Sequence, residues 1–252
     1  MGAVVLAAVW AGGINTLVGS GTLVTFPVLI AMGVPPVPAN ISNAVGLVAG
    51  GVSGTIGYLP EMKGMGRRVL QLVPMSVLGA ITGASLLLVL PAEAFAAIVP
   101  ALIAVGIVLV IFGPRLQAWA RRHHEDGGVT PPSHLVALMA GVLVAGVYGG
   151  YFGAAQGVVL IGLLSALSTE PLQSLNGLKN VLGTIVNAIA SLVFILVAPE
   201  HIDWAIAGLV AVGAILGGAL GARYGRRLPP NALRAVIVVV GVVGLVKFVF
   251  FP

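Results

Sequence analysis

Two glycine-rich interruptions of long apolar runs constrain the fold of this chain more than any other feature. The first covers Gly12–Pro27 (GGINTLVGSGTLVTFP), and a degenerate copy (GGYFGAAQGVV) covers residues 149–159. Gly149 follows Gly13 by 136 positions (149 − 13), and Gly157 follows Gly21 by the same number (157 − 21). Non-helical backbone in lipid must satisfy its own N–H and C=O groups, so it is retained where it lines a cavity. Interruptions at matching places in two halves therefore point to the substrate site of a transporter.

The composition indicates an integral membrane protein. The chain is 59% hydrophobic, with a mean hydropathy of +1.13, values above those of soluble domains, and only 8% charged, a value far below theirs. The net charge of +5 comes from basic residues in short loops. These residues are interpreted as determinants of membrane topology and not as a nucleic-acid-binding surface. The absence of cysteine excludes disulfides and thiolate chemistry.

Ten apolar segments predict an all-α polytopic membrane protein. Because a lipid-spanning helix needs about 20 residues, the short first two segments of each half are expected to be a broken helix or a re-entrant hairpin, followed by three full spans. The first repeat is predicted at residues 1–113, a cytoplasmic linker at 114–134 and the second repeat at 135–252. The segments are Val4–Val18, Thr22–Met32, Ile41–Leu59, Val69–Leu90, Ala94–Phe112, Leu135–Gly150, Gly157–Leu167, Leu178–Ala198, Ala205–Ala222 and Ala232–Phe251.

The distribution of basic residues predicts that the two repeats are inverted. Lys and Arg mark cytoplasmic loops, which places Pro60–Arg68, the linker and Arg223–Pro230 inside. The loop at Glu93 and the loop Pro199–Asp203 contain no Lys or Arg and are placed outside. In the repeat alignment Pro60–Arg68 corresponds to Pro199–Asp203, yet the two loops fall on opposite sides. The repeats are therefore predicted to be antiparallel, with five helical segments each and both termini outside.

The sequence resembles the TauE/SafE sulfite exporter family of membrane permeases. In the first half the resemblance rests on the run from Gly13 to Pro27 and on ANISNAV at residues 39–45; in the second it rests on GGYFGAAQG at 149–157 and NGLKN at 176–180. It spans both halves and nearly the whole chain. It implies a multi-pass protein of a bacterial-type inner cell membrane that exports sulfite, an organosulfonate or another small anion.

The acidic residues favour an anionic or neutral substrate. All seven fall in loops or at helix ends, and none lies inside an apolar run, whereas cation pumps and proton relays place carboxylates within the membrane. Gly21-Thr22 and Gly157-Val158 are each expected to open a helix, whose free N–H groups and dipole attract anions. Facing each other across a pseudo-two-fold axis, they would form an anion cradle. In the alternative interpretation the glycines only permit close helix packing.

Four asparagines add polar groups to the apolar segments that follow the glycine breaks. Asn40 and Asn43 lie one helical turn apart, and so do Asn176 and Asn180. Asn43 and Asn180 are interpreted either as substrate contacts or as hydrogen bonds between repeats. Asn40 and Asn176 are candidates for helix caps as well.

Lys179 is a candidate counter-charge for the substrate, and its alternative is a side chain that snorkels to the membrane interface. Asn187 and Ser191 share the face of the same predicted helix and extend the polar path. The residues predicted to bind the substrate are Asn15, Thr16, Ser20, Gly21, Thr22, Asn43, Tyr151, Gln156, Gly157, Lys179 and Asn180.

The leading functional hypothesis is a secondary transporter, an exporter, in which one repeat rocks against the other around the broken helices. A channel-like anion facilitator is the first alternative, and a membrane enzyme or assembly factor the second. No catalytic residue, metal ligand or cofactor is assigned. The expected partners are the small anion and the lipid bilayer, with no nucleic acid. A coupling ion such as the proton and the oligomeric state stay open.

Overall fold

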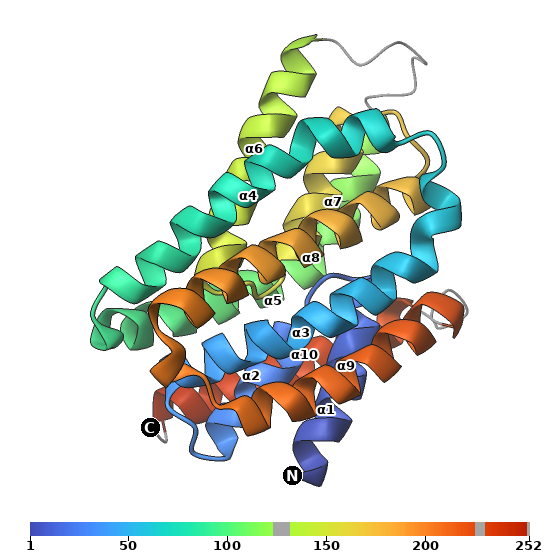
Figure 1. Cartoon of the computed structure of the whole chain (residues 1–252). Coiled ribbons are helices and arrows are strands. Elements are labelled where there is room, and N and C mark those ends of the chain that lie inside the picture. Colours follow the sequence, from blue (N-terminus) through green and yellow to red (C-terminus); the bar gives the residue numbers. More distant parts are fainter. Residues whose placement is uncertain (123–131, 225–229, 251–252) are drawn as a thin grey trace.

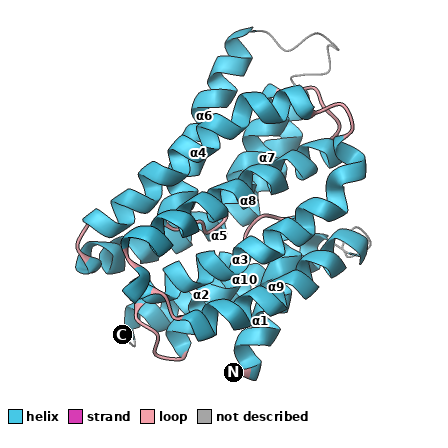
Figure 2. Ribbon diagram, in the orientation of Figure 1, coloured by secondary structure: helices cyan, strands magenta, loops and turns pink. Residues whose placement is uncertain are grey.

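The computed structural model of the chain describes residues 1–122, 132–224 and 230–250. All regular secondary structure in these residues is helical, which confirms the predicted all-α class (Figure 2). Parts of the predicted linker (123–131) and of the loop after Arg223 (225–229) lie outside the described residues. The elements are α1 (Gly2–Leu17), α2 (Thr22–Ala31), α3 (Pro36–Tyr58), η1 (Leu59–Met62), α4 (Gly66–Val89), α5 (Ala92–Arg122), α6 (Pro132–Tyr151), α7 (Gln156–Leu167), α8 (Leu172–Val197), η2 (Pro199–His201), α9 (Trp204–Tyr224) and α10 (Pro230–Phe250).

Within the described residues, five helices are long and apolar enough to cross a membrane: α4, α5, α6, α8 and α9. Helices α1, α2 and α7 are apolar but shorter. One element differs from the expectation that both pieces of each broken pair are short. Helix α6 has 20 residues, because its helical conformation continues towards the linker beyond the apolar run from which its length was predicted. A multi-pass membrane architecture follows from these lengths.

Both predicted interruptions are present at the ends of α1 and α6. The amides of Val18 and Gly19 both donate to Ile14 O at the end of α1, and the amides of Phe152 and Gly153 both donate to Tyr148 O at the end of α6. Gly19 has a φ of +85° and Gly153 a φ of +76°, a left-handed conformation that glycine adopts without steric cost. Each glycine therefore ends one helix and lets the chain turn into the next, α2 or α7.

Most helices pack chiefly on helices from the other half of the chain. Helix α1 packs most extensively on α9, and its counterpart α6 packs on α4. Likewise α2 contacts α10 as α7 contacts α5, while α3 contacts α8 and α5 contacts α10. Figure 1 shows the result as two groups of helices, with α4, α6, α7 and α8 lying beside the group α1, α2, α3, α9 and α10. The same pattern of contacts thus occurs in both halves.

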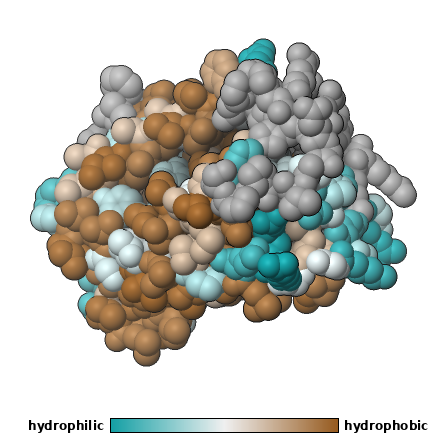
Figure 3. All heavy atoms as spheres, turned by 90° about the horizontal axis from the view of Figure 1, so that it is seen from above, coloured by the Kyte–Doolittle hydropathy of each residue, from teal (hydrophilic) through white to brown (hydrophobic). Residues whose placement is uncertain are grey.

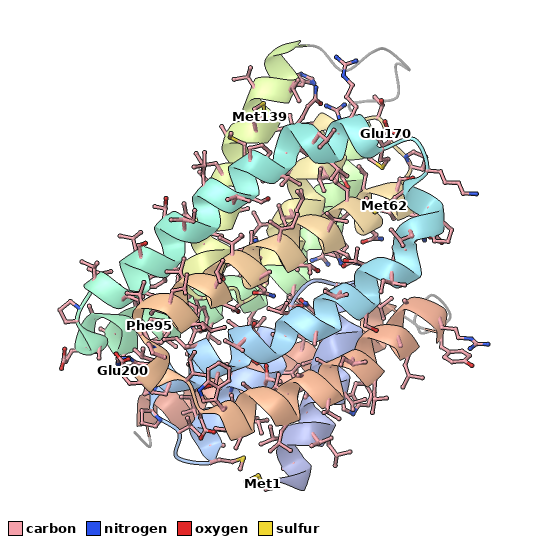
Figure 4. The ribbon with its side chains drawn as sticks, in the orientation of Figure 1. Met1, Met62, Phe95, Met139, Glu170 and Glu200 are labelled. Carbon is pink, nitrogen blue, oxygen red and sulfur yellow. The ribbon has the colours of Figure 1, made fainter. Side chains whose placement is uncertain are left out.

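On the face drawn in Figure 3, apolar side chains dominate the described residues, and the hydrophilic ones lie mainly on the right of the view, with a smaller group at its left edge. Leu70, Val89 and Leu196 are among the large apolar side chains that are exposed, as expected for helices that face lipid. In Figure 4, Met62 and Glu170 lie at one end of the helices, and Phe95 and Glu200 lie at the opposite end. The predicted topology likewise places the loop that contains Met62 on one side of the membrane and the loops at Glu93 and Glu200 on the other. The side of the membrane that each end faces stays a prediction.

Candidate substrate site

A small polar cavity lies where the two broken helices meet α8. Its volume of ≈ 20 Å³ has room for about one water molecule. Three elements supply most of its polar groups: the end of α1, the start of α7 and the middle of α8. The lining residues are Asn15, Thr16, Gly19, Thr22, Gly51, Gly153, Gln156, Gly157, Lys179, Asn180, Gly183, Thr184 and Asn187.

Lys179 reaches from α8 to the last carbonyls of α1. Its Nζ lies 3.3 Å from Asn15 O and 3.0 Å from Thr16 O, and the residue is only 2% exposed. Carbonyls in the last turn of a helix have no intrahelical donor and carry the negative end of the helix dipole. The ammonium group satisfies two of them from the wall of the cavity. The alternative in which Lys179 snorkels to the membrane interface does not describe this structure.

One face of α8 supplies most of the remaining polar groups. Lys179, Gly183 and Asn187 recur at intervals of four residues, and so do Asn180 and Thr184, so all five residues can face the same cavity. Thr184 uses its hydroxyl to donate to Asn180 O at 2.7 Å. Asn180 Nδ2 is buried without a hydrogen-bond partner.

Gln156, at the start of α7, also lines the cavity and has an unpaired donor. Its Nε2 is buried without a hydrogen-bond partner, and the residue is only 5% exposed. A side chain at Gly149 would collide with the Gln156 carboxamide, so the glycine of the repeated motif makes room for this group. Buried donors normally have an acceptor, and leaving one unpaired costs about 1–3 kcal/mol. An acceptor atom in the cavity would remove that cost.

The two helix breaks contact each other directly, but at a different glycine from the one expected. The amide of Gly157 donates to Gly19 O at 2.9 Å, and a Cβ at either position would overlap the backbone of the other. Gly21, expected to face Gly157, instead packs on Ala11 and Asn15 of its own half. The Gly157 N–H is therefore already paired and is not a free donor for an anion. The left-handed turn falls at Gly19, and Gly21, two residues later, is the N-cap of α2.

Four of the predicted binding residues do not line the cavity: Ser20, Gly21, Asn43 and Tyr151. Asn43 Nδ2 lies 3.4 Å from Thr22 Oγ1, so it supports a residue that does line the cavity. Ser20 is fully buried, with an unpaired hydroxyl. The Tyr151 carbonyl accepts a hydrogen bond from Asn40 Nδ2 at 3.0 Å. Asn40 is thus a contact between the two halves and not a helix cap, since α3 is capped by Pro35.

Seven of the predicted binding residues line the cavity, together with further residues that were not predicted. The predicted ones are Asn15, Thr16, Thr22, Gln156, Gly157, Lys179 and Asn180, and Asn187 joins them as the polar continuation of α8. The additional ones are Gly19, Gly51, Gly153, Gly183 and Thr184. The helical spacing from Lys179 and Asn180 was a signal for Gly183 and Thr184. Gly51 had none, because it is brought there by the packing of α3 on α8.

The ionisable residues of the cavity are distributed asymmetrically between the two halves. None of its lining residues is acidic, and Lys179 is its one basic residue. In the repeat alignment Asn43 corresponds to Asn180 (180 − 43 = 137), so Lys179 corresponds to Ser42 (179 − 137 = 42), which is neutral and outside the lining. A cavity with an ammonium group, two unpaired amide donors and no carboxylate is suited to an anion.

Comparisons with known proteins identify a family of membrane transporters. A family model described as "Sulfite exporter TauE/SafE" matches residues 4–248. The "Probable membrane transporter protein YfcA" of Escherichia coli (strain K12) is 30% identical over 264 residues, covering 99% of this chain and 90% of that protein. The "Probable membrane transporter protein ORF9" of Sinorhizobium sp is 26% identical, covering 98% of this chain and 91% of that protein. No solved structure matches this chain.

Proposed function

This chain belongs to the sulfite exporter TauE/SafE family, and from that premise we propose that it is a secondary transporter that exports a small anion, such as sulfite or an organosulfonate. The family match over nearly the whole chain identifies it as a membrane transporter of this type. We propose in addition that the substrate is an anion, that transport is outward and that it proceeds by alternating access.

One observation carries the anionic substrate: the residues that line the cavity include a lysine and two carboxamides with unpaired donors, and none of them is acidic. Asn180 Nδ2 and Gln156 Nε2 are buried and unpaired. Lys179 has three donors, of which two are directed to α1 carbonyls. An oxyanion offers several acceptors and a negative charge, so it would satisfy all of these groups at once. A cation would leave them unpaired and meet a like charge.

The size of the cavity supports alternating access and not an open channel. A volume of ≈ 20 Å³ holds about one water molecule and is too small for an oxyanion. The walls must therefore move for the substrate to bind and leave. Polar contacts between the two groups of helices include Gly157 N to Gly19 O, Asn40 to Tyr151 O and Thr55 Oγ1 to Thr184 Oγ1 at 3.3 Å. Contacts of this kind can be exchanged for contacts with water or substrate at low cost.

The test is exchange of sulfite and of methanesulfonate in liposomes that contain the purified protein. A secondary transporter gives saturable uptake that is accelerated by the same anion on the other side of the membrane. A channel-like facilitator gives uptake that follows the membrane potential and shows no acceleration. Transport of cations in place of either anion would contradict the proposal.

A further inference from the structure

The carbonyl end of α1 is built like a cation site. Because the amides of Val18 and Gly19 both return to Ile14 O, the carbonyls of Asn15 and Thr16 extend beyond the last backbone donors of the helix. The negative end of the helix dipole lies at the same place. In transporters with discontinuous helices, carbonyls at such ends coordinate the coupling sodium ion. The end of α1 offers that coordination beside the substrate cavity.

In this chain a protein side chain already fills that position. Lys179 Nζ donates to Thr16 O at 3.0 Å and to Asn15 O at 3.3 Å. A lysine ammonium is a compact point charge with three donors. Two donors are used by the carbonyls, and the third is left for the cavity that Lys179 lines. The ammonium group therefore connects the end of α1 to the place where the anion binds.

The corresponding end of α6 has the same backbone geometry and a neutral side chain among its donors. The amides of Phe152 and Gly153 return to Tyr148 O in the same way. At this end Tyr151 O, whose counterpart in α1 is Leu17 O, accepts from the neutral amide of Asn40. The two broken helices thus end alike, and at the end of α1 a lysine donates to the carbonyls that follow Ile14.

We propose that the Lys179 ammonium is a tethered counter-cation that occupies the position of a coupling sodium ion. It stabilises the end of α1 and balances the charge of the bound anion, so that anion binding and exchange need no dissolved alkali cation. The inference rests on the proposed anion transport and adds its ion requirement.

The first experiment uses the unmodified protein. Binding of sulfite and of methanesulfonate is measured with sodium, potassium or N-methyl-D-glucamine as the only added cation. The expected result is the same dissociation constant in all three, within about twofold. A requirement for sodium would overturn the inference. Failure to bind either anion in any of the three would instead overturn the proposed function, so the two failures are distinguishable.

The second experiment removes the tethered charge. Lys179→Ala opens space at the α1 carbonyls, and its anion affinity should fall about tenfold to a hundredfold, the usual value of a charge-assisted hydrogen bond. Methylammonium, a small soluble ammonium ion, should restore affinity in a saturable manner. Lys179→Met is the matched control, since it fills the lysine volume without a charge and should resist rescue. Lys63→Ala, at an exposed lysine outside the cavity, should behave as the unmodified protein.

Thermal unfolding in detergent establishes that each variant is folded before its affinity is compared. Rescue of the alanine variant but not of the methionine variant supports the tethered cation. Undiminished affinity in folded Lys179→Ala contradicts it, and so does equal failure of methylammonium, sodium and potassium to rescue that variant.

Discussion

At the scale of single residues, Gly183 gives the cleanest access to the cavity. It lines the cavity, yet a Cβ at this position would meet nothing within 4 Å. A methyl group there would occupy a space that holds about one water molecule without displacing any neighbour. The role of the cavity can therefore be separated from the stability of the fold.

Gly183→Ala is expected to weaken anion binding by roughly tenfold or more, since one misplaced methyl group in a close-fitting site has that effect. The free energy of unfolding should stay the same or rise by up to about 1 kcal/mol, because alanine favours a helix over glycine. The dissociation constant and the melting temperature are measured on the same preparation. Gly162→Ala, in α7, is the control: it too meets nothing within 4 Å and lies outside the cavity. Equal affinities for the two variants would exclude the cavity as the binding site.

Much of the site was accessible from the sequence, residue by residue. Lys179, Asn180 and Gln156 were selected because polar groups in apolar segments demand a partner, and all three line the cavity. The contact between Gly19 and Gly157 was not predicted. The spacing of the repeat aligns Gly21 with Gly157 but does not reveal at which glycine the chain turns. That choice depends on backbone dihedral angles, which are set by the packing of both halves together.

At the scale of elements, the contact between the two helix breaks combines packing and function. Gly157 at the start of α7 and Gly19 after α1 lie so close that neither tolerates a side chain. The hydrogen bond between them also joins the two halves directly at the edge of the cavity. Close packing is thus observed at these glycines, and their role in a substrate site stays a prediction.

Gly157→Ala is expected to separate α7 from the end of α1. Overpacking of this kind costs about 1–3 kcal/mol, so the melting temperature should fall, and transport should be lost because the cavity wall is displaced. Unfolding and anion exchange are measured together, with Gly162→Ala in the same helix as control. If the glycines only permit packing, the folded fraction of Gly157→Ala will bind the anion as tightly as the unmodified protein.

At the scale of the whole molecule, helices of each half pack on helices of the other half. The groups of helices that are expected to move as units therefore differ from the two sequence repeats. The sequence suggested that one repeat rocks against the other. In the structure α9 packs on α1 and α3, while α4 packs on α6 and α8. We therefore expect α1, α2, α3 and α9 to move together against α4, α6, α7 and α8, with α5 and α10 between them. No local pattern in the sequence encodes which helix packs on which, so this pairing could not be predicted.

The predicted topology can be tested directly because the chain contains no cysteine. Single cysteines at Lys63 and at His201 report on the two ends of the helices. A membrane-impermeant maleimide applied to intact cells should label His201→Cys at once and Lys63→Cys only after permeabilisation, as the basic loops predict. Both positions are exposed, so access is limited by the membrane alone. Labelling of both cysteines from the same side would contradict the inverted repeats.

The packing of each half on helices of the other half has a consequence for the synthesis of the protein. When the first half has entered the membrane, α1 still lacks α9 and α4 still lacks α6, the helices against which each packs most extensively. The glycine-lined faces of α4 that later meet α6 are then open to lipid or to any protein that escorts nascent helices. We therefore expect the first half to stay incompletely packed until α6 and α9 have been synthesised and inserted. Two separately encoded halves should assemble only when they are made together, and each alone should be degraded.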